Sequence, residues 1–141
     1  MSTDFRTLLK ERLRNDQTGE RWFDDLDING IYYLSVQAST LHESKPSELL
    51  DDVSGYEAFE VTLQTQQGVF IHGRRGAWEE LFEKSWWGLL EEESPILRTG
   101  SAVPVSTVQA IFEDLTAVAA AHPEYKTKRS GCGGCGSLKV N

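Results

Sequence analysis

Residues 25–38 read DLDINGIYYLSVQA, and they set the strand arrangement that we expect for the rest of the chain. Asn-Gly at 29–30 is the strongest short-range signal for a two-residue β-hairpin turn, because both residues tolerate the positive φ angles of a type I′ turn. Residues 31–38 are rich in aromatic and β-branched side chains, which favours a strand. The stretch therefore predicts a hairpin with Ile28 opposite Ile31.

The same stretch also matches the first half of a calcium-binding loop, D-x-[DN]-x-[DN]-G. With Asp25 at loop position 1, position 12 is Val36, where such a loop needs a bidentate glutamate. A strand pattern follows Gly30, whereas a helix follows a calcium loop. We therefore favour the hairpin, and a bare loop or a metal site remains the alternative that a calcium titration of the melting temperature would test.

Hydrophobic spacing predicts the other elements. Phe59, Val61 and Leu63 alternate with polar residues, as in a half-buried strand. Apolar residues at helical spacing predict three main helices, and a short helix and a short strand complete the set. The main helices are expected at about 5–13, 77–93 and 104–121, the short helix at 47–53 and the short strand at 69–71.

This order of elements predicts the fold class, because strands that cluster between helices suggest α+β rather than a doubly wound fold. We expect a small antiparallel sheet of three to four strands, with the N-terminal helix and two C-terminal helices packed on one face. The 141 residues are enough for one ordinary domain. We assign residues 1–125 to a single globular α+β domain and residues 126–141 to a flexible, glycine-rich basic tail.

The negative charge is concentrated in one segment. The chain has a net charge of −8, and residues 22–60 contain nine acidic residues and one lysine. A field of this sign disfavours general nucleic-acid binding and can steer a basic protein partner, although solubility alone would also explain it. The residues expected to steer such a partner are Asp24, Asp25, Asp27, Asp51 and Asp52.

Trp87 is the aromatic residue that we expect to anchor a partner. On the predicted helix 77–93 it lies away from the apolar face that contains Trp78 and Leu81. Tryptophan is enriched in binding hot spots, so an exposed ring at this position would suit an interface. The alternative is a ring covered by the N-terminal helix or by the tail.

A basic spot precedes the same predicted helix. His72, Arg74 and Arg75 lie in the segment HGRRG at 72–76. Two guanidinium groups beside a helix N-terminus suit an anion-binding site. Ion pairs of these arginines with nearby glutamates or with the acidic segment are the alternative, since exposed pairs of this kind are common and weak.

Both cysteines lie in the tail, where Cys132 and Cys135 form a C-x-x-C motif. Two thiolates at this spacing can bind a soft metal ion, zinc or copper, or form a redox disulfide. A structural zinc site needs four ligands, and the sequence has no second C-x-x-C and no nearby histidine pair. We therefore expect no required cofactor, and metal binding, thiol chemistry and incidental cysteines remain the alternatives for the tail.

No catalytic arrangement stands out, because the three histidines lie in separate segments and no spacing selects a pair of carboxylates. The N-terminus has no apolar signal region and no apolar run is long enough to span a membrane, so we expect a cytoplasmic protein without membrane contacts. We hypothesise a small non-enzymatic protein-binding module, such as an inhibitor, an immunity-type or an adaptor protein. A metal- or thiol-handling protein is the alternative, and an enzyme or ligand binder with an anion pocket at 72–76 is a third hypothesis.

Overall fold

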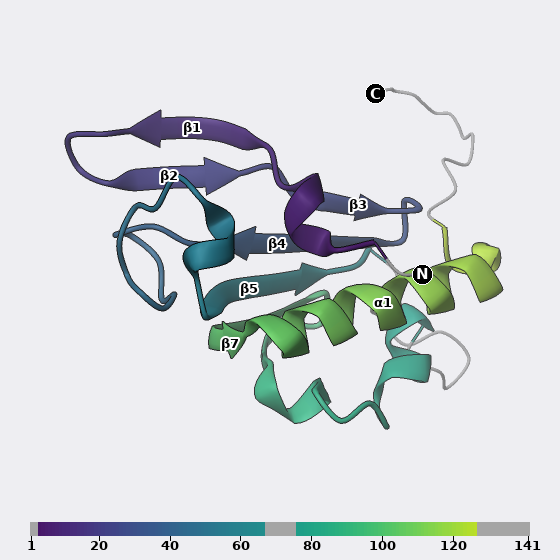
Figure 1. The fold of residues 1–141 in the computed structure, drawn as a ribbon. Coiled ribbons are helices and arrows are strands. Elements are labelled where there is room, and N and C mark those ends of the chain that lie inside the picture. Colours follow the sequence, from purple (N-terminus) through teal and green to yellow (C-terminus); the bar gives the residue numbers. More distant parts are fainter. Residues whose placement is uncertain (1–2, 67–75, 127–141) are drawn as a thin grey trace.

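The computed structural model describes residues 3–66 and 76–126, and seven strands and one α-helix within them form a mixed α+β fold. The strands make two antiparallel sheets (Figure 1). The smaller sheet pairs β1 (Glu11–Asn15) with β2 (Glu20–Phe23). The larger sheet has the order β3-β4-β5-β7-β6. Its strands are β3 (Leu26–Ile28), β4 (Tyr32–Gln37), β5 (Ala58–Gln64), β7 (Leu97–Pro104) and β6 (Glu91–Ser94).

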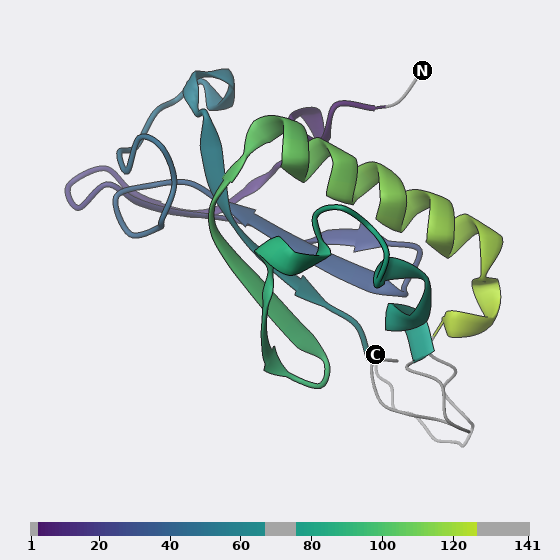
Figure 2. The same ribbon diagram turned by 90° about the horizontal axis from the view of Figure 1, so that it is seen from below.

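One face of the five-stranded sheet is covered by α1 (Val105–Ala121) and by the segment 76–90, which lie beside each other in Figures 1 and 2. The segment 76–90 contains two short 3-10 helices, η3 (Gly76–Leu81) and η4 (Trp87–Leu89). The other short 3-10 helices are η1 (Phe5–Leu8), η2 (Val53–Gly55) and η5 (Pro123–Tyr125).

The core lies between this face of the sheet and α1. Leu34, Val36, Val61 and Leu63 are all fully buried, and Leu34 pairs with Leu63 as Val36 does with Val61. They point the same way because side chains two residues apart on a strand share a face. The buried side of α1 consists of Val108, Ile111, Leu115, Val118 and Ala119.

The helix predicted at 104–121 is confirmed, with two details at its ends. Pro104 is the N-cap rather than the first helical residue. His122 follows the last helical residue and Pro123 comes next, where a proline cannot continue the helix. The strands predicted at 31–38 and around Phe59 are also confirmed, as β4 and β5.

The hairpin between β3 and β4 is confirmed, but its predicted register was wrong by one residue. Asn29 and Gly30 have φ angles of 57° and 69°, and Ile31 N donates to Ile28 O at 3.1 Å. Ile28 pairs with Tyr32, so Ile31 is an additional residue of the loop. This register lets Ile31 enter the core, where 1% of it is exposed.

The predicted N-terminal helix at 5–13 is wrong. Only η1 forms, and β1 follows it in a hairpin with β2. Leu8 and Leu13 were expected on a buried stripe, yet they are 41% and 49% exposed. The spacing of these residues suited a helix, but pairing across the turn at 16–19 prevails over local propensity.

The predicted helix at 77–93 is also wrong, and no strand was predicted where β7 forms. The indole of Trp78 donates to Pro95 O and that of Trp86 donates to Asp114 Oδ2, each at 2.7 Å. These long-range bonds hold η3 and η4 as separate short helices. Residues from Glu91 onward pair with β7 and do not continue a helix. Gly100 weakens the strand pattern of β7 in the sequence. A glycine suits this position because a Cβ there would come within 2.7 Å of Leu90 Cδ2.

The fold class is therefore α+β as expected, but the arrangement of elements within that class was wrong. A sheet of three to four strands with three helices is replaced by two sheets, of two and five strands, and one main C-terminal helix. The short helix expected at 47–53 is replaced by η2 at its end, and the strand expected at 69–71 lies outside the described residues. None of the described helices is sufficiently long and apolar to cross a membrane.

Candidate functional site

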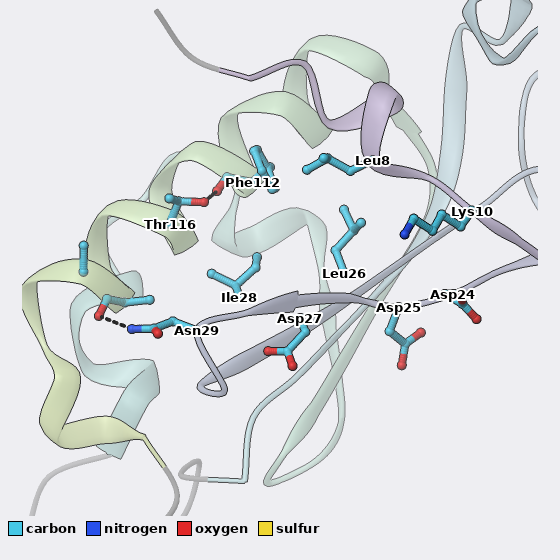
Figure 3. Close-up of a pocket in the computed structure, with 12 residues that line it drawn as sticks. Leu8, Lys10, Asp24, Asp25, Leu26, Asp27, Ile28, Asn29, Phe112 and Thr116 are labelled. Carbon is cyan, nitrogen blue, oxygen red and sulfur yellow. Dashed lines mark hydrogen bonds between the residues drawn. The ribbon is translucent and has the colours of Figure 1, made fainter.

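A groove of about 690 Å³ opens between β3, η1 and α1, and we call it the acidic groove (Figure 3). It combines an apolar floor with carboxylates on one side. Its lining residues are Leu8, Lys10, Asp24, Asp25, Leu26, Asp27, Ile28, Asn29, Phe112, Thr116, Ala119 and Ala120.

The apolar floor of the groove consists of side chains of β3 and α1 that point toward each other. Leu26 and Ile28 alternate with Asp27 on β3 and are 8% and 6% exposed. Figure 3 shows both pointing toward α1, where Phe112 faces them. Phe112 itself is half-buried, so part of its ring remains available to a ligand in the groove.

Three of the predicted steering residues, Asp24, Asp25 and Asp27, lie along the other side of β3 and the residues before it. All three are exposed, and Figure 3 shows Asp25 and Asp27 pointing away from α1. Asp27 Oδ1 accepts a hydrogen bond from Gly30 N at 2.8 Å, which fixes this carboxylate at the turn. Asp24 lies 3.9 Å from the guanidinium of Arg12, and such an exposed pair contributes little.

The two ends of the groove were not expected from the sequence. Leu8 and Lys10 close one end, and Asn29 Nδ2 donates to Ala119 O at 3.4 Å at the other. Among the described residues that line the groove, Lys10 is the single basic one, so carboxylates dominate the charge of this lining. No local signal links residues 8–10 or 26–29 to α1, because these contacts arise only when the chain folds.

Asp51 and Asp52 do not line the acidic groove. Asp51 accepts from Arg14 Nη2 at 2.5 Å, and Asp52 caps η2 by accepting from Ser54 N at 2.9 Å. The hydrogen bonds from Ser54 hold the pKa of Asp52 below its usual value. The five predicted aspartates therefore divide into three that line the groove and two that pair elsewhere, Asp51 with Arg14 and Asp52 with Ser54.

Trp87 is half-buried within an aromatic cluster. Its ring centroid lies 5.2 Å from that of Phe82 and 5.7 Å from that of Trp78, and the guanidinium of Arg98 stacks 4.0 Å above it. The cover of this ring comes from aromatic neighbours and Arg98 rather than from an N-terminal helix. Its role as a partner anchor stays a prediction.

A buried polar corner lies near β2, and no pattern of residues had selected it. Ser39 Oγ and His42 Nδ1 are 2.8 Å apart, and the indole of Trp22 meets the imidazole edge to face at 4.4 Å. Burial lowers the pKa of His42, and its Nε2 has no hydrogen-bond partner among the described residues. Because Ser39 is fully buried, its hydroxyl is not presented to a substrate.

The remaining predicted sites lie outside the described residues. These are the anion site of His72, Arg74 and Arg75 and the metal or thiol site of Cys132 and Cys135. Within residues 3–66 and 76–126, no group of three or more histidine, cysteine or acidic side chains is arranged to hold a metal ion.

Comparison with known proteins gives no relative from which a function could be transferred. No family model matches the chain, and no curated protein or solved structure matches it either. The acidic groove is therefore interpreted from its own geometry and charge.

Proposed function

We propose that this chain is a small non-enzymatic protein-binding module, of the inhibitor, immunity or adaptor type, that binds a basic partner in the acidic groove. The observation that carries the proposal is the juxtaposition of Leu26 and Ile28 with Asp27 on one short strand, directly preceded by Asp25. Apolar side chains supply contact area, and carboxylates beside them select a positively charged partner.

The charge of the groove supports the kind of partner. The described lining residues include three aspartates and one lysine, within a chain of net charge −8. Such a field speeds the association of a basic protein at low ionic strength and weakens as salt screens it. Binding should therefore be fastest at low salt, with a rate that falls as salt is added.

Affinity capture with a matched pair of variants tests the proposal. In one variant Asp24, Asp25 and Asp27 become asparagine; in the other Glu91, Glu92 and Glu93, which are exposed on β6, become glutamine. Both variants remove three negative charges, so any effect of net charge on partner binding is the same in both. We expect the groove variant to lose a basic partner captured by the parent chain at low salt, while the β6 variant retains it.

Two outcomes would contradict the proposal. One is capture of the same basic partner by the parent chain and both variants, which would place binding elsewhere. The other is equal loss in both variants, which would show that only overall charge matters.

A further inference from the structure

The outer edge of β3 is open in the described part of the chain. β3 is the end strand of the five-stranded sheet, with β4 on its inner side. β1 covers the edge of the preceding strand β2, and the last bond of that ladder runs from Asp24 N to Lys10 O at 2.8 Å. The chain before Leu9 forms η1, so within residues 3–66 and 76–126 no strand pairs with the outer edge of β3 (Figure 1).

We propose that the basic partner binds as an extended segment that adds a strand to this edge, with apolar and basic side chains in alternation. The inference rests on the proposed function, because it describes how the partner enters the acidic groove. Strand addition of this kind uses main-chain hydrogen bonds for affinity and alternate side chains for specificity.

The backbone of β3 supplies hydrogen-bonding groups for such a strand. Ile28 O accepts from Ile31 N and so faces the β4 side of the hairpin. Because successive residues of a strand direct these groups to opposite edges, the N–H and C=O of Asp27 face the open edge. Asp27 is therefore the residue against which a partner strand would pair.

The side chains of β3 determine the pattern of the partner. Neighbouring residues on adjacent strands point to the same face of a sheet. Residues opposite Leu26 and Ile28 would point into the groove toward Phe112, and residues opposite Asp25 and Asp27 would lie beside carboxylates (Figure 3). Apolar residues suit the first positions and lysine or arginine the second.

The groove also limits the length of the bound segment. Lys10 stands at one end, and the bond between Asn29 and Ala119 stands at the other. Only the short strand β3 and the two residues before it lie between these ends, so about three to five partner residues would pair, at roughly 3.3 Å each.

Fluorescence anisotropy with synthetic peptides tests the inference on the full chain. The first probe is a blocked, labelled heptapeptide that alternates lysine and valine. The second has the same composition, with all lysines before all valines. Strand addition predicts at least tenfold tighter binding of the alternating peptide, because only in that peptide do the paired residues place valines in the groove and lysines beside carboxylates.

Backbone methylation gives a second, independent readout. In one form of the alternating peptide the valine nitrogens are methylated, and in the other the lysine nitrogens. Because alternate N–H groups face opposite edges, only one of these forms should lose binding, and its identity gives the direction of the added strand. Equal binding of both methylated forms would overturn strand addition.

The remaining outcomes separate this inference from the proposed function. If the two unmethylated peptides bind equally, and replacing Asp24, Asp25 and Asp27 by asparagine weakens both, strand addition is overturned while the acidic groove remains a binding site. If neither peptide binds the parent chain, both proposals fail, and the aspartates instead protect an edge strand from pairing.

Discussion

Arg21 places its guanidinium against Tyr56 in the interior, with Nη2 3.0 Å from the tyrosine Oη and none of the arginine side chain exposed. The same guanidinium donates to Ala38 O and Leu50 O, each at 2.8 Å. It also lies 4.5 Å from the ring centroid of Phe23. One buried cation therefore connects β2 to the end of β4 and to the loop before η2, which are far apart in the sequence.

Replacing Arg21 by methionine should lower the free energy of unfolding by about 2–6 kcal/mol, because two carbonyls lose their donor and each buried unsatisfied group costs roughly 1–3 kcal/mol. Urea unfolding followed by circular dichroism measures the change. Arg12→Met is the control, since this side chain is 62% exposed and pairs only loosely with Asp24. Equal losses in the two variants would show that the buried network contributes nothing beyond charge.

His42 gives the fold a predicted dependence on pH. Burial lowers its pKa, with opposing contributions from Glu60 and Glu20 and a further lowering by Arg21. Above the unfolded-state value of about 6.5 the imidazole is neutral in both states. As pH falls below that value the unfolded chain binds a proton first, so stability decreases until the lowered pKa is reached.

Urea midpoints at pH 7.5 and 5.5 measure this effect, and His42→Asn should reduce the difference between them. The control is Asp52→Asn, because the pKa of that carboxyl is lowered from 3.8 and its titration lies below the tested range. The slope due to His42 cannot exceed about 1.4 kcal/mol per pH unit. An unchanged difference in His42→Asn would locate the pH dependence in other groups.

Local signals were sufficient for the parts of the fold that depend on neighbouring residues. The turn at Asn29 and Gly30 and the helix at 105–121 follow from backbone preference and spacing. The one-residue register shift was not predicted, because Ile31 becomes buried only when it packs against the core. No local pattern specifies that contact. The incorrect helices at 5–13 and 77–93 failed for the same reason, since pairing with distant strands replaced local helical preference.

The candidate site was predictable in part. The acidic segment indicated Asp24, Asp25 and Asp27, which line the groove. Leu8 and Phe112 fit the apolar stripes of two predicted helices, but nothing linked them to β3. The meeting of α1 with β3 depends on contacts across about ninety positions, as in the bond between Asn29 and Ala119. Asp51 and Asp52 were predicted together with these three but do not line the groove, since position along the chain does not decide whether two carboxylates share a surface.

Gly30 should be required for the turn beside the groove. Its φ of 69° is a conformation that costs an L-residue about 1–2 kcal/mol, and a Cβ there would lie 3.1 Å from Lys126 Cε. Gly30→Ala should therefore lower the free energy of unfolding by that amount in a urea titration. Gly88→Ala is the matched control, because a Cβ at Gly88 meets nothing within 4 Å and its φ is not positive. Similar effects at both positions would contradict the role of the turn.

Thr116→Lys should block the acidic groove without damaging the fold. Thr116 is exposed on α1 and lines the groove, and its hydroxyl donates to Phe112 O at 2.8 Å. Lysine favours helix more than threonine does, so the free energy of unfolding should change by less than about 0.5 kcal/mol. Its long cationic side chain would occupy the groove and repel a basic ligand, and we expect at least tenfold weaker binding of the alternating lysine-valine peptide.

Ala117→Lys provides the comparison for this variant, since Ala117 is also exposed on α1 but does not line the groove. Both substitutions add one positive charge, and at physiological salt a charge outside the groove is screened over about 8 Å. The control should therefore weaken peptide binding by less than twofold in the same anisotropy titration. Equal weakening by Thr116→Lys and Ala117→Lys would show that the peptide responds to the overall field and not to the space between β3 and α1.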